Sequence, residues 1–490
     1  MRAIGCLGMV VGIALLLGCG RSPLESSQGK DLRPDPAAPV WLRLFSDAPE
    51  QLRGQLTREG LDVTGSHHRL GFVDVLVAPS EKDALLSRWA PLISRLELLG
   101  TLGSRADNLS LYHSPDEVSK TLDEVQSRYP AIARKVALGN PLFEGHVIYG
   151  MKISDHVEQD ENEPVFLLDG QIHAREVMTA EIGLDAIDYL TSRYDTDPQV
   201  KAWVDGLEIW IVPVINPDGA AAVFQGNTFW RKNRNPTCAV DLNRNFSWNY
   251  GACSGATSAC WAETYSGSGA ASEPETQQLR TLYAKLRPIY YLHYHAYGEY
   301  ILWPSGCKRV DDHDLFALVG KELNNRVPND SGKTGQWKIG PIAEAIYEAP
   351  GGSIDDAYGS FGVIALAFEI NSTSFAPDYV RYRDLTVQRQ RVAWQYLLDR
   401  ALSGPSIRGS VRDEDTLLPL VATYELTNRP FTSGQLPLQT DAQGSFARAI
   451  LPGSDLTVTF SAAGYRPRTS QVHVDQNAVD LDIRLSKISP

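Results

Sequence analysis

The chain has 490 residues and a mass of 54.0 kDa, a length that predicts two to four domains. Hydrophobic residues make up 43% and charged residues 21%, which excludes a collagen-like, coiled-coil or wholly disordered protein. The chain carries 46 Lys and Arg against 59 Asp and Glu, and this net charge of −13 argues against nucleic acid as a partner.

The amino terminus has the pattern of an export signal. An apolar run from Ala3 to Leu17 is shorter than the ~20 residues that a membrane span requires. It ends in Leu-Leu-Gly-Cys, which resembles the lipobox of bacterial lipoproteins. We therefore expect residues 1–18 to be a signal peptide and Cys19 to be lipidated, with the protein facing the periplasm or the cell surface. An ordinary secreted protein is the alternative. The lipid at Cys19 would be its only membrane attachment.

Residues 19–37 are rich in Ser, Pro and charge and predict a linker. Residues 38–105 predict a small α+β domain, because short apolar runs alternate with amphipathic stretches. Its strands are expected at 40–45, 68–79 and 95–100, and its helices at 48–60 and 81–93.

The region 110–402 predicts an α/β fold with a mixed, mostly parallel sheet. Several of its strands are apolar throughout, as expected of inner strands covered by helices on both faces. The strands are expected at 147–154, 164–170, 207–215, 289–296 and 363–370, and the helices at 114–129, 176–194, 273–286 and 314–325. In residues 405–490, short alternating strands recur about every ten residues and predict a small β-sandwich.

The first chemical signal follows the strand at 164–170. His173 and Glu176 stand three residues apart in a turn, where both side chains could reach one cation. This H-x-x-E spacing is weak evidence by itself, because an exposed His beside a Glu at a helix start gives the same pattern.

Further candidates lie on two apolar strands. His293 and His295 share one face of the strand at 289–296, so periodicity does not decide which of them is a ligand and which a core histidine. Glu369 is the only charge in the strand at 363–370. A carboxylate there is costly unless it has a chemical role or a buried ion-pair partner.

Seven motifs in order resemble the zinc metallocarboxypeptidase family, carboxypeptidase A type, from Ser110 to Leu402. They are HARE at 173–176, FWRKNRN at 229–235, DLNRNF at 241–246, ETYSG at 263–267, HAYGEY at 295–300, IYEAPGGSIDDAYG at 346–359 and AFEI at 367–370. The resemblance implies one zinc ion held by His173, Glu176 and His295, and it leaves His293 as a strand neighbour. The tail, including GSFARAILPGSDLTVTFSAAGYRPRT, resembles the transthyretin-like carboxypeptidase regulatory module, a structural or interaction domain whose partner is unknown.

The same resemblance implies the roles of the other site residues. Glu369 would be the general base, Arg231 the oxyanion stabiliser and Asp241 the carboxylate that orients the first His ligand. Asn243 and Arg244 would hold the carboxylate of the substrate, and Tyr347 would close over it. Arg175 and Tyr297 would line the adjoining subsites, and Ile342 and Ile354 the pocket for the departing side chain.

Ile354 predicts preference for an apolar or aromatic carboxyl-terminal residue. Asp355 and Asp356 follow it directly, so an alignment shifted by one residue would predict Lys or Arg instead. Four Cys remain after Cys19, which permits three complete pairings. The family resemblance implies that Cys238 pairs with Cys260 and leaves Cys253 and Cys307 unassigned.

These features predict a zinc-dependent carboxypeptidase that acts on the carboxyl termini of peptides or proteins. One alternative keeps the fold but hydrolyses cell-wall peptides or N-acyl amino acids. A second alternative is a non-catalytic peptide-binding protein, against which the retained Glu369 argues. The amino-terminal domain could also act as an inhibitory propeptide, although its sequence does not clearly resemble one.

Overall fold

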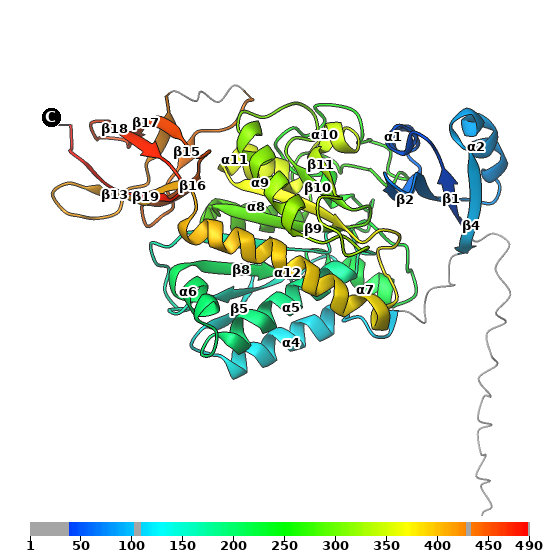
Figure 1. Ribbon diagram of the computed structural model, residues 1–490, viewed down its shortest axis with the longest axis horizontal. Helices are drawn as coiled ribbons and strands as arrows, with labels where there is room; N and C mark the ends of the chain where they lie inside the picture. The colour runs from blue at the N-terminus through cyan, green and yellow to red at the C-terminus, as the bar shows by residue number, and fades with distance from the viewer. Residues whose placement is uncertain (1–38, 102–108, 428–432, 489–490) are drawn as a thin grey trace, which may run out of the picture. The chain divides into compact units, whose positions relative to one another are not determined.

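The computed structural model describes residues 39–101, 109–427 and 433–488 (Figure 1). The predicted signal peptide, Cys19 and the linker at 19–37 lie outside the described residues. Within the described ranges, no helix combines the length and the apolar character needed to cross a bilayer.

A central eight-stranded sheet forms the middle of the chain, in the order β11-β10-β12-β9-β7-β8-β6-β5. Strands β12, β9, β7 and β8 run parallel to one another, β10 and β11 form a further parallel pair, and the remaining pairings are antiparallel. This confirms the predicted mixed, mostly parallel sheet. The strands are β5 (Ala133–Ala137), β6 (Tyr149–Ile153), β7 (Val165–Asp169), β8 (Glu208–Val212), β9 (Tyr290–Ala296), β10 (Tyr300–Trp303), β11 (Lys338–Pro341) and β12 (Ile364–Ile370).

Helices cover both faces of this sheet, as the apolar strands predict (Figure 1). On β7, Phe166 and Leu168 belong to the core that contains α5 and α12, whereas Leu167 belongs to the core that contains α8. The helices are α4 (Pro115–Arg128), α5 (Met178–Arg193), α6 (Pro198–Gly206), α7 (Pro217–Phe224), α8 (Pro274–Leu286), α9 (His313–Arg326), α10 (Ile342–Ala345), α11 (Ser353–Phe361) and α12 (Tyr379–Ser403).

The amino-terminal segment forms a four-stranded antiparallel sheet in the order β2-β3-β1-β4. Its elements are β1 (Val40–Phe45), α1 (Pro49–Arg58), β2 (Asp62–His67), β3 (Phe72–Val77), α2 (Lys82–Trp89) and β4 (Arg95–Thr101). Strand β2 was not predicted from the sequence, and β3 begins at Phe72 rather than at residue 68, where the predicted strand began. Strand β2 reads DVTGSH, which lacks apolar alternation because its buried side chains meet polar and aromatic groups of the central region.

The carboxyl-terminal segment contains two sheets, one ordered β16-β13-β19 and one ordered β15-β14-β17-β18. Side chains from both sheets contribute to a single apolar core, so the segment is a β-sandwich. Its strands are β13 (Ser406–Asp413), β14 (Thr423–Leu426), β15 (Leu438–Gln439), β16 (Ser445–Ala449), β17 (Ser454–Ser461), β18 (Arg468–Val474) and β19 (Ala478–Leu485).

Candidate active site

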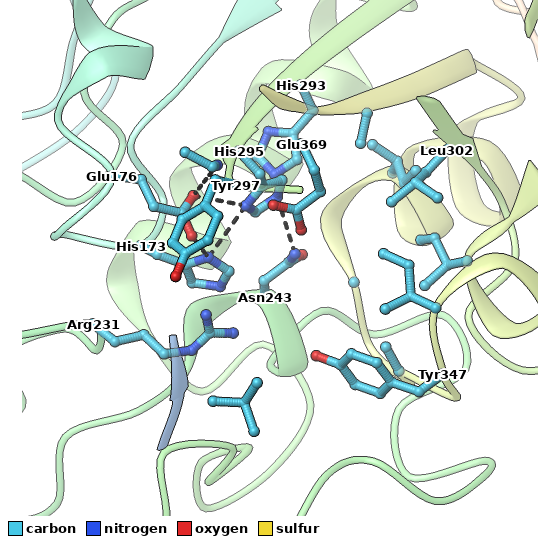
Figure 2. Close-up of a pocket in the computed structure, with 18 of the residues that line it drawn as sticks. His173, Glu176, Arg231, Asn243, His293, His295, Tyr297, Leu302, Tyr347 and Glu369 are labelled. Carbon is cyan, nitrogen blue, oxygen red and sulfur yellow. Dashed lines mark hydrogen bonds and ion pairs between the residues drawn. The ribbon is translucent and has the colours of Figure 1, made fainter. Parts of the chain in front are cut away.

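A cavity of about 680 Å³, which includes its opening to solvent, lies where β7, β9 and β12 end. This is the edge at which parallel α/β sheets usually bind ligands. Figure 2 shows the side chains that converge there. Arg175 and Asp241 lie just outside the cavity wall, whereas the other predicted ligand, base, clamp and pocket residues line it: His173, Glu176, Arg231, Asn243, Arg244, His295, Tyr297, Ile342, Tyr347, Ile354 and Glu369.

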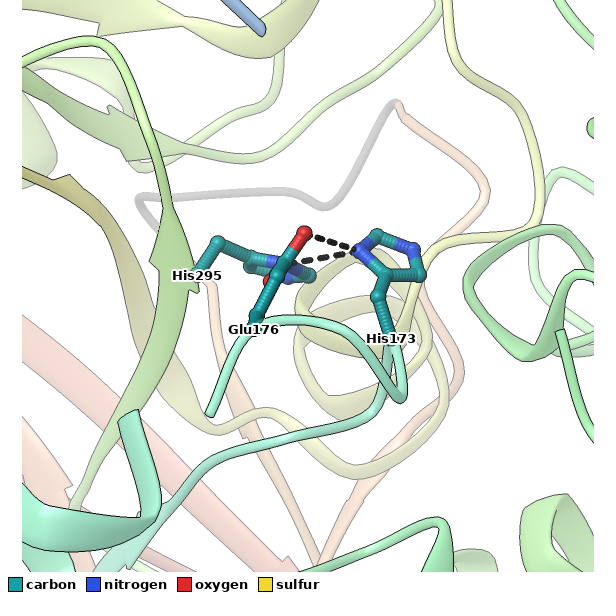
Figure 3. Close-up of side chains that lie close together, drawn as sticks. All are labelled: His173, Glu176 and His295. Atoms are coloured by element: carbon teal, nitrogen blue, oxygen red, sulfur yellow. Dashed lines mark hydrogen bonds and ion pairs between the residues drawn. The ribbon is translucent and has the colours of Figure 1, made fainter. Parts of the chain in front are cut away.

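His173, Glu176 and His295 form a buried cluster at the base of the cavity (Figure 3). The neighbouring strands β7 and β9 are parallel, so the loop after β7 and the end of β9 meet at one edge. The Glu176 carboxylate contacts Nδ1 of His173 through Oε1 at 2.8 Å and Nδ1 of His295 through Oε2 at 3.0 Å. The two Nδ1 atoms face each other at 3.2 Å.

This donor set fits zinc. Burial and the neighbouring His293 lower the pKa of His295 to about 3, so its ring is neutral, which is the form that binds a metal. Tetrahedral zinc with Zn–N bonds of ~2.0–2.1 Å would place two ligand nitrogens about 3.3 Å apart, close to the observed 3.2 Å. A cation between the two nitrogens explains why they can face each other in a buried site.

Asp241 supports this cluster from outside the cavity wall. Its Oδ1 lies 3.3 Å from Nε2 of His173, the nitrogen that faces away from the cluster. Its Oδ2 accepts a hydrogen bond of 2.8 Å from Nη2 of Arg231. Burial opposes the charge of Arg231, but the Asp241 carboxylate raises the pKa of Arg231 above its ordinary value. Asp241 therefore contacts both a predicted ligand and the predicted oxyanion stabiliser.

Glu369 projects from β12 into the same cavity. Strand register pairs Glu369 with His295, so the predicted base and a predicted ligand lie side by side on neighbouring strands. Burial raises the pKa of Glu369 to about 8, while the guanidinium of Arg53 acts in the opposite direction from 3.9 Å away. The carboxylate is thus held in a desolvated place, where its basicity is increased.

Asn243 and Tyr347 also point into the cavity (Figure 2), and Arg244 lines it as well. Asn243 Nδ2 lies 3.2 Å from Nε2 of His295. The Arg244 guanidinium donates from Nε to Gly255 O and from Nη1 to Asn243 O, which fixes its plane. Its Nη2 donates to the Tyr347 hydroxyl at 3.0 Å. A planar cation held this way is suited to bind a carboxylate with two hydrogen bonds.

Arg175 and Tyr297 contact the amino-terminal segment. Both carboxylate oxygens of Asp62 accept from Arg175 Nη1, at 2.8 and 2.9 Å. The Tyr297 ring packs against Gly65 so closely that an added Cβ there would lie 2.3 Å from the ring. Strand β2 therefore covers both predicted subsite residues.

The pocket beside Ile342 and Ile354 is largely apolar, with Leu302, Ile346 and Ala367 also in its wall. The two carboxylates after Ile354 face elsewhere. Asp355 accepts a hydrogen bond from the Gly306 amide, and Asp356 accepts from Arg280 and from the Trp248 amide. The helix register of α11 thus presents Ile354 to the cavity.

Two disulfides lie in the loops around the site. Cys238 joins Cys260, the pair that the family resemblance implies. Cys253 joins Cys307, a pairing that sequence reasoning left open.

Several residues that line the cavity were given no role from the sequence, among them Arg53, Val63, Thr64 and His293. The first three belong to the amino-terminal segment, and no local pattern connects them to a site more than 100 residues further along the chain. His293 was predicted to be only a strand neighbour of the ligand. Its position two residues before His295, on the same face of the strand, was the feature that could have placed it in the cavity.

Comparison with known proteins agrees with this geometry. The family model described as zinc carboxypeptidase matches residues 118–382. Rat carboxypeptidase A2 is 31% identical over 278 residues, which are 55% of this chain and 64% of the rat protein. Zinc carboxypeptidase of Simulium vittatum is 32% identical over 272 residues, which are 53% of this chain and 85% of that protein. The chain thus spans a little under two thirds of the length of the rat relative.

Among solved structures, carboxypeptidase A from Helicoverpa armigera superimposes with a TM-score of 0.62 and 25% sequence identity, covering 75% of this chain and 98% of the other. The matched family region contains every predicted ligand and the predicted base. The family match covers more than half of the sequence, and the chain therefore belongs to the zinc carboxypeptidase family, carboxypeptidase A type.

Proposed function

We propose that the protein is a zinc-dependent carboxypeptidase that removes single apolar or aromatic residues from the carboxyl termini of peptides. The observation that carries this proposal is the convergence of His173, Glu176 and His295 with Glu369 and Arg244 in one cavity. A metal triad, a base and a carboxylate-binding cation are the parts that such a hydrolase requires.

Zinc bound to His173, Glu176 and His295 would supply Lewis acidity toward the scissile carbonyl and a lowered pKa for an attacking water. Glu369 accepts the proton of that water and passes it to the departing amine. Arg231, oriented by Asp241, stabilises the negative charge that develops on the carbonyl oxygen.

Substrate binding uses the other side of the cavity. Arg244 and Asn243 hold the free carboxylate, and the Tyr347 hydroxyl, now bonded to Arg244, would move to admit it. The departing side chain enters the pocket of Ile342, Ile354 and Leu302. Among the described residues, those beside Ile342, Ile354 and Leu302 are apolar, and this supports preference for apolar or aromatic residues over Lys or Arg.

The amino-terminal domain limits this activity to short substrates. Asp62 and Gly65 engage Arg175 and Tyr297, the two residues proposed to bind the part of a peptide that precedes the scissile bond. A blocked dipeptide needs little of that space, whereas a longer peptide competes with strand β2 for it.

We also propose that the protein is exported. The amino-terminal leader with Cys19 would place it at the outer side of a membrane as a lipoprotein, or free outside the cell. Two disulfides among the four Cys after Cys19 support an oxidising compartment. The carboxyl-terminal sandwich is proposed as a transthyretin-like structural module, supported by hydrogen bonds from Trp248 Nε1 to Gly434 O and from Gln435 Nε2 to Tyr358 O.

The test is release of Phe or Arg from two blocked dipeptides that differ only in this last residue. We expect faster release of Phe, abolished by phenanthroline. Glu369→Gln keeps the size of the side chain but removes the base, so kcat should fall about 10²- to 10⁴-fold while the zinc content stays at one ion per chain. Faster release of Arg would contradict the apolar pocket, and release that survives the chelator would contradict a metal enzyme.

A further inference from the structure

His293 is a buried histidine, and only one of its two ring nitrogens has a hydrogen-bond partner among the described residues. Only 1% of its surface is exposed. Its Nδ1 lies 2.5 Å from Oδ1 of Asp169, and the other oxygen of Asp169 accepts a hydrogen bond of 2.8 Å from the Tyr291 hydroxyl. The ring orientation is therefore fixed from the side of Nδ1. Nε2 is buried and has no hydrogen-bond partner among the described residues.

The ring borders the cavity at the level of the side-chain pocket. Strand register pairs His293 with Ala367 on β12, and Ala367 in turn pairs with Leu302 on β10. All three residues line the cavity. They form a row two residues before His295 and Glu369, so His293 lies beside the pocket for the departing side chain rather than on the metal.

The hydrogen bonds of Asp169 define what Nε2 can do. Oδ2 of Asp169 accepts a hydrogen bond from the Tyr291 hydroxyl, and Oδ1 of Asp169 faces Nδ1 of His293 as an acceptor. This contact places the ring proton on Nδ1, and no described residue lies within hydrogen-bond distance of Nε2. In this tautomer Nε2 offers a lone pair and is a hydrogen-bond acceptor.

A buried acceptor without a partner is costly, and a ligand that donates to it recovers that cost. Ala367 leaves space beside the ring, because its side chain is a single methyl group. We propose that His293 Nε2 accepts a hydrogen bond from the departing side chain and selects aromatic residues that carry a donor, Trp and Tyr, over Phe. This inference rests on the proposed carboxypeptidase function.

The kinetic test uses the zinc-loaded full chain and pairs of blocked dipeptides. Trp is compared with 3-benzothienylalanine, in which sulfur replaces the indole N–H, and Tyr is compared with Phe. A hydrogen bond to a buried acceptor predicts a kcat/KM advantage of about 5- to 100-fold for the donor-bearing member of each pair. Equal kcat/KM values within both pairs of the wild-type protein would overturn the inference, and this result needs no variant.

His293→Leu removes the acceptor and keeps an apolar side chain of similar size. The Trp advantage over 3-benzothienylalanine should fall to about 1, and an unchanged zinc content shows that the metal site is intact. His293→Gln retains an acceptor and should therefore keep part of the Trp advantage. It also provides a second test if His293→Leu folds poorly. An advantage that persists unchanged in both variants would overturn the role of His293.

A binding measurement separates this inference from the proposed function. Indole-3-propanoate and benzothiophene-3-propanoate each carry a carboxylate and a ring but have no bond to hydrolyse. Calorimetry should show tighter binding of the indole by the wild-type protein and equal binding by His293→Leu. This result without any peptide hydrolysis would support the inference and contradict the proposed function. Peptide hydrolysis with no indole preference, or no difference between the two acids, would overturn the inference.

Discussion

Asp62→Ala should increase the activity of the full chain on long peptides. Asp62 is the acid of strand β2 that binds Arg175 through both carboxylate oxygens. Without it, β2 loses its charged contact with the proposed peptide-binding surface. Arg175 itself remains available to substrate, because the substitution changes only the covering strand.

The size of the effect follows from the burial of the pair. The Arg175 side chain is 1% exposed and Asp62 is 15% exposed, so the ion pair is largely desolvated. Breaking such a pair costs about 3–5 kcal/mol. Arg175 keeps hydrogen bonds to Phe229 O and Val63 O, which reduces the cost to about 2–3 kcal/mol, or roughly 30- to 150-fold in the docking equilibrium of the domain.

The assay compares kcat/KM for an octapeptide and a blocked dipeptide that both end in Phe. We expect the ratio of long to short substrate to rise at least about tenfold in Asp62→Ala, since undocking frees the subsites that only the octapeptide needs. Asp47→Ala, which removes an exposed acid of the same domain, serves as the control and should leave the ratio unchanged. Removal of the domain by limited proteolysis sets the upper limit. If excision raises the ratio but Asp62→Ala does not, the assigned contact is wrong; if neither does, β2 does not obstruct peptides.

Three other predictions concern stability and specificity. Burial raises the pKa of Glu275 to about 8, so the folded chain holds a proton there that the unfolded chain releases near 4.5. Stability therefore falls as pH rises between these two values. The Tm gain of Glu275→Gln should be larger at pH 8.5 than at pH 5, and a constant gain would contradict this. The Cys253–Cys307 disulfide closes a 54-residue loop, so replacing both Cys by Ala should cost about 4 kcal/mol in denaturant unfolding; a loss below about 1 kcal/mol would show that the loop gains little from closure. Ala367→Leu fills the middle of the pocket wall, so kcat/KM should fall at least about tenfold for Trp relative to Val, whereas equal losses would place Ala367 outside the selective surface.

Only part of the chemical core was predictable from local patterns, because the ligand set as a whole, including the choice of His295 over His293, came from the family resemblance. Glu369 is a lone charge in an apolar strand, and His173 and Glu176 follow directly after another apolar strand. Adjacent parallel strands bring these positions to one edge of the sheet. The predicted alternation of strands and helices already implies parallel strands, and therefore this shared edge. The roles of Asn243, Arg244 and Tyr347 came only through family resemblance, because their loops have no periodicity.

The contacts of strand β2 with the site could not be predicted from local patterns. Strand β2 meets Tyr297, Tyr300 and Glu299 through Gly65, Ser66 and His67. These are polar or small residues that match partners more than 200 positions away along the chain. A single sequence carries no trace of such pairing, and no strand was therefore predicted at Asp62–His67. The partner of Cys253 was open for the same reason, since four Cys allow several pairings.

The residues proposed for chemistry and those proposed for selectivity occupy two successive rows of the same three strands. Tyr300, Glu369 and His295 are register partners across β10, β12 and β9. The second row contains Ala367 on β12 and His293 on β9, each two residues earlier than its first-row neighbour. Its third member is Leu302 on the antiparallel β10, two residues after Tyr300. Side chains two apart on a strand point to the same face, and every member of the two rows except Tyr300 lines one cavity. A substitution in the second row can therefore change which side chain is accepted while the ligands and the base keep their positions, and this is why the His293 and Ala367 variants should move substrate ratios more than zinc content.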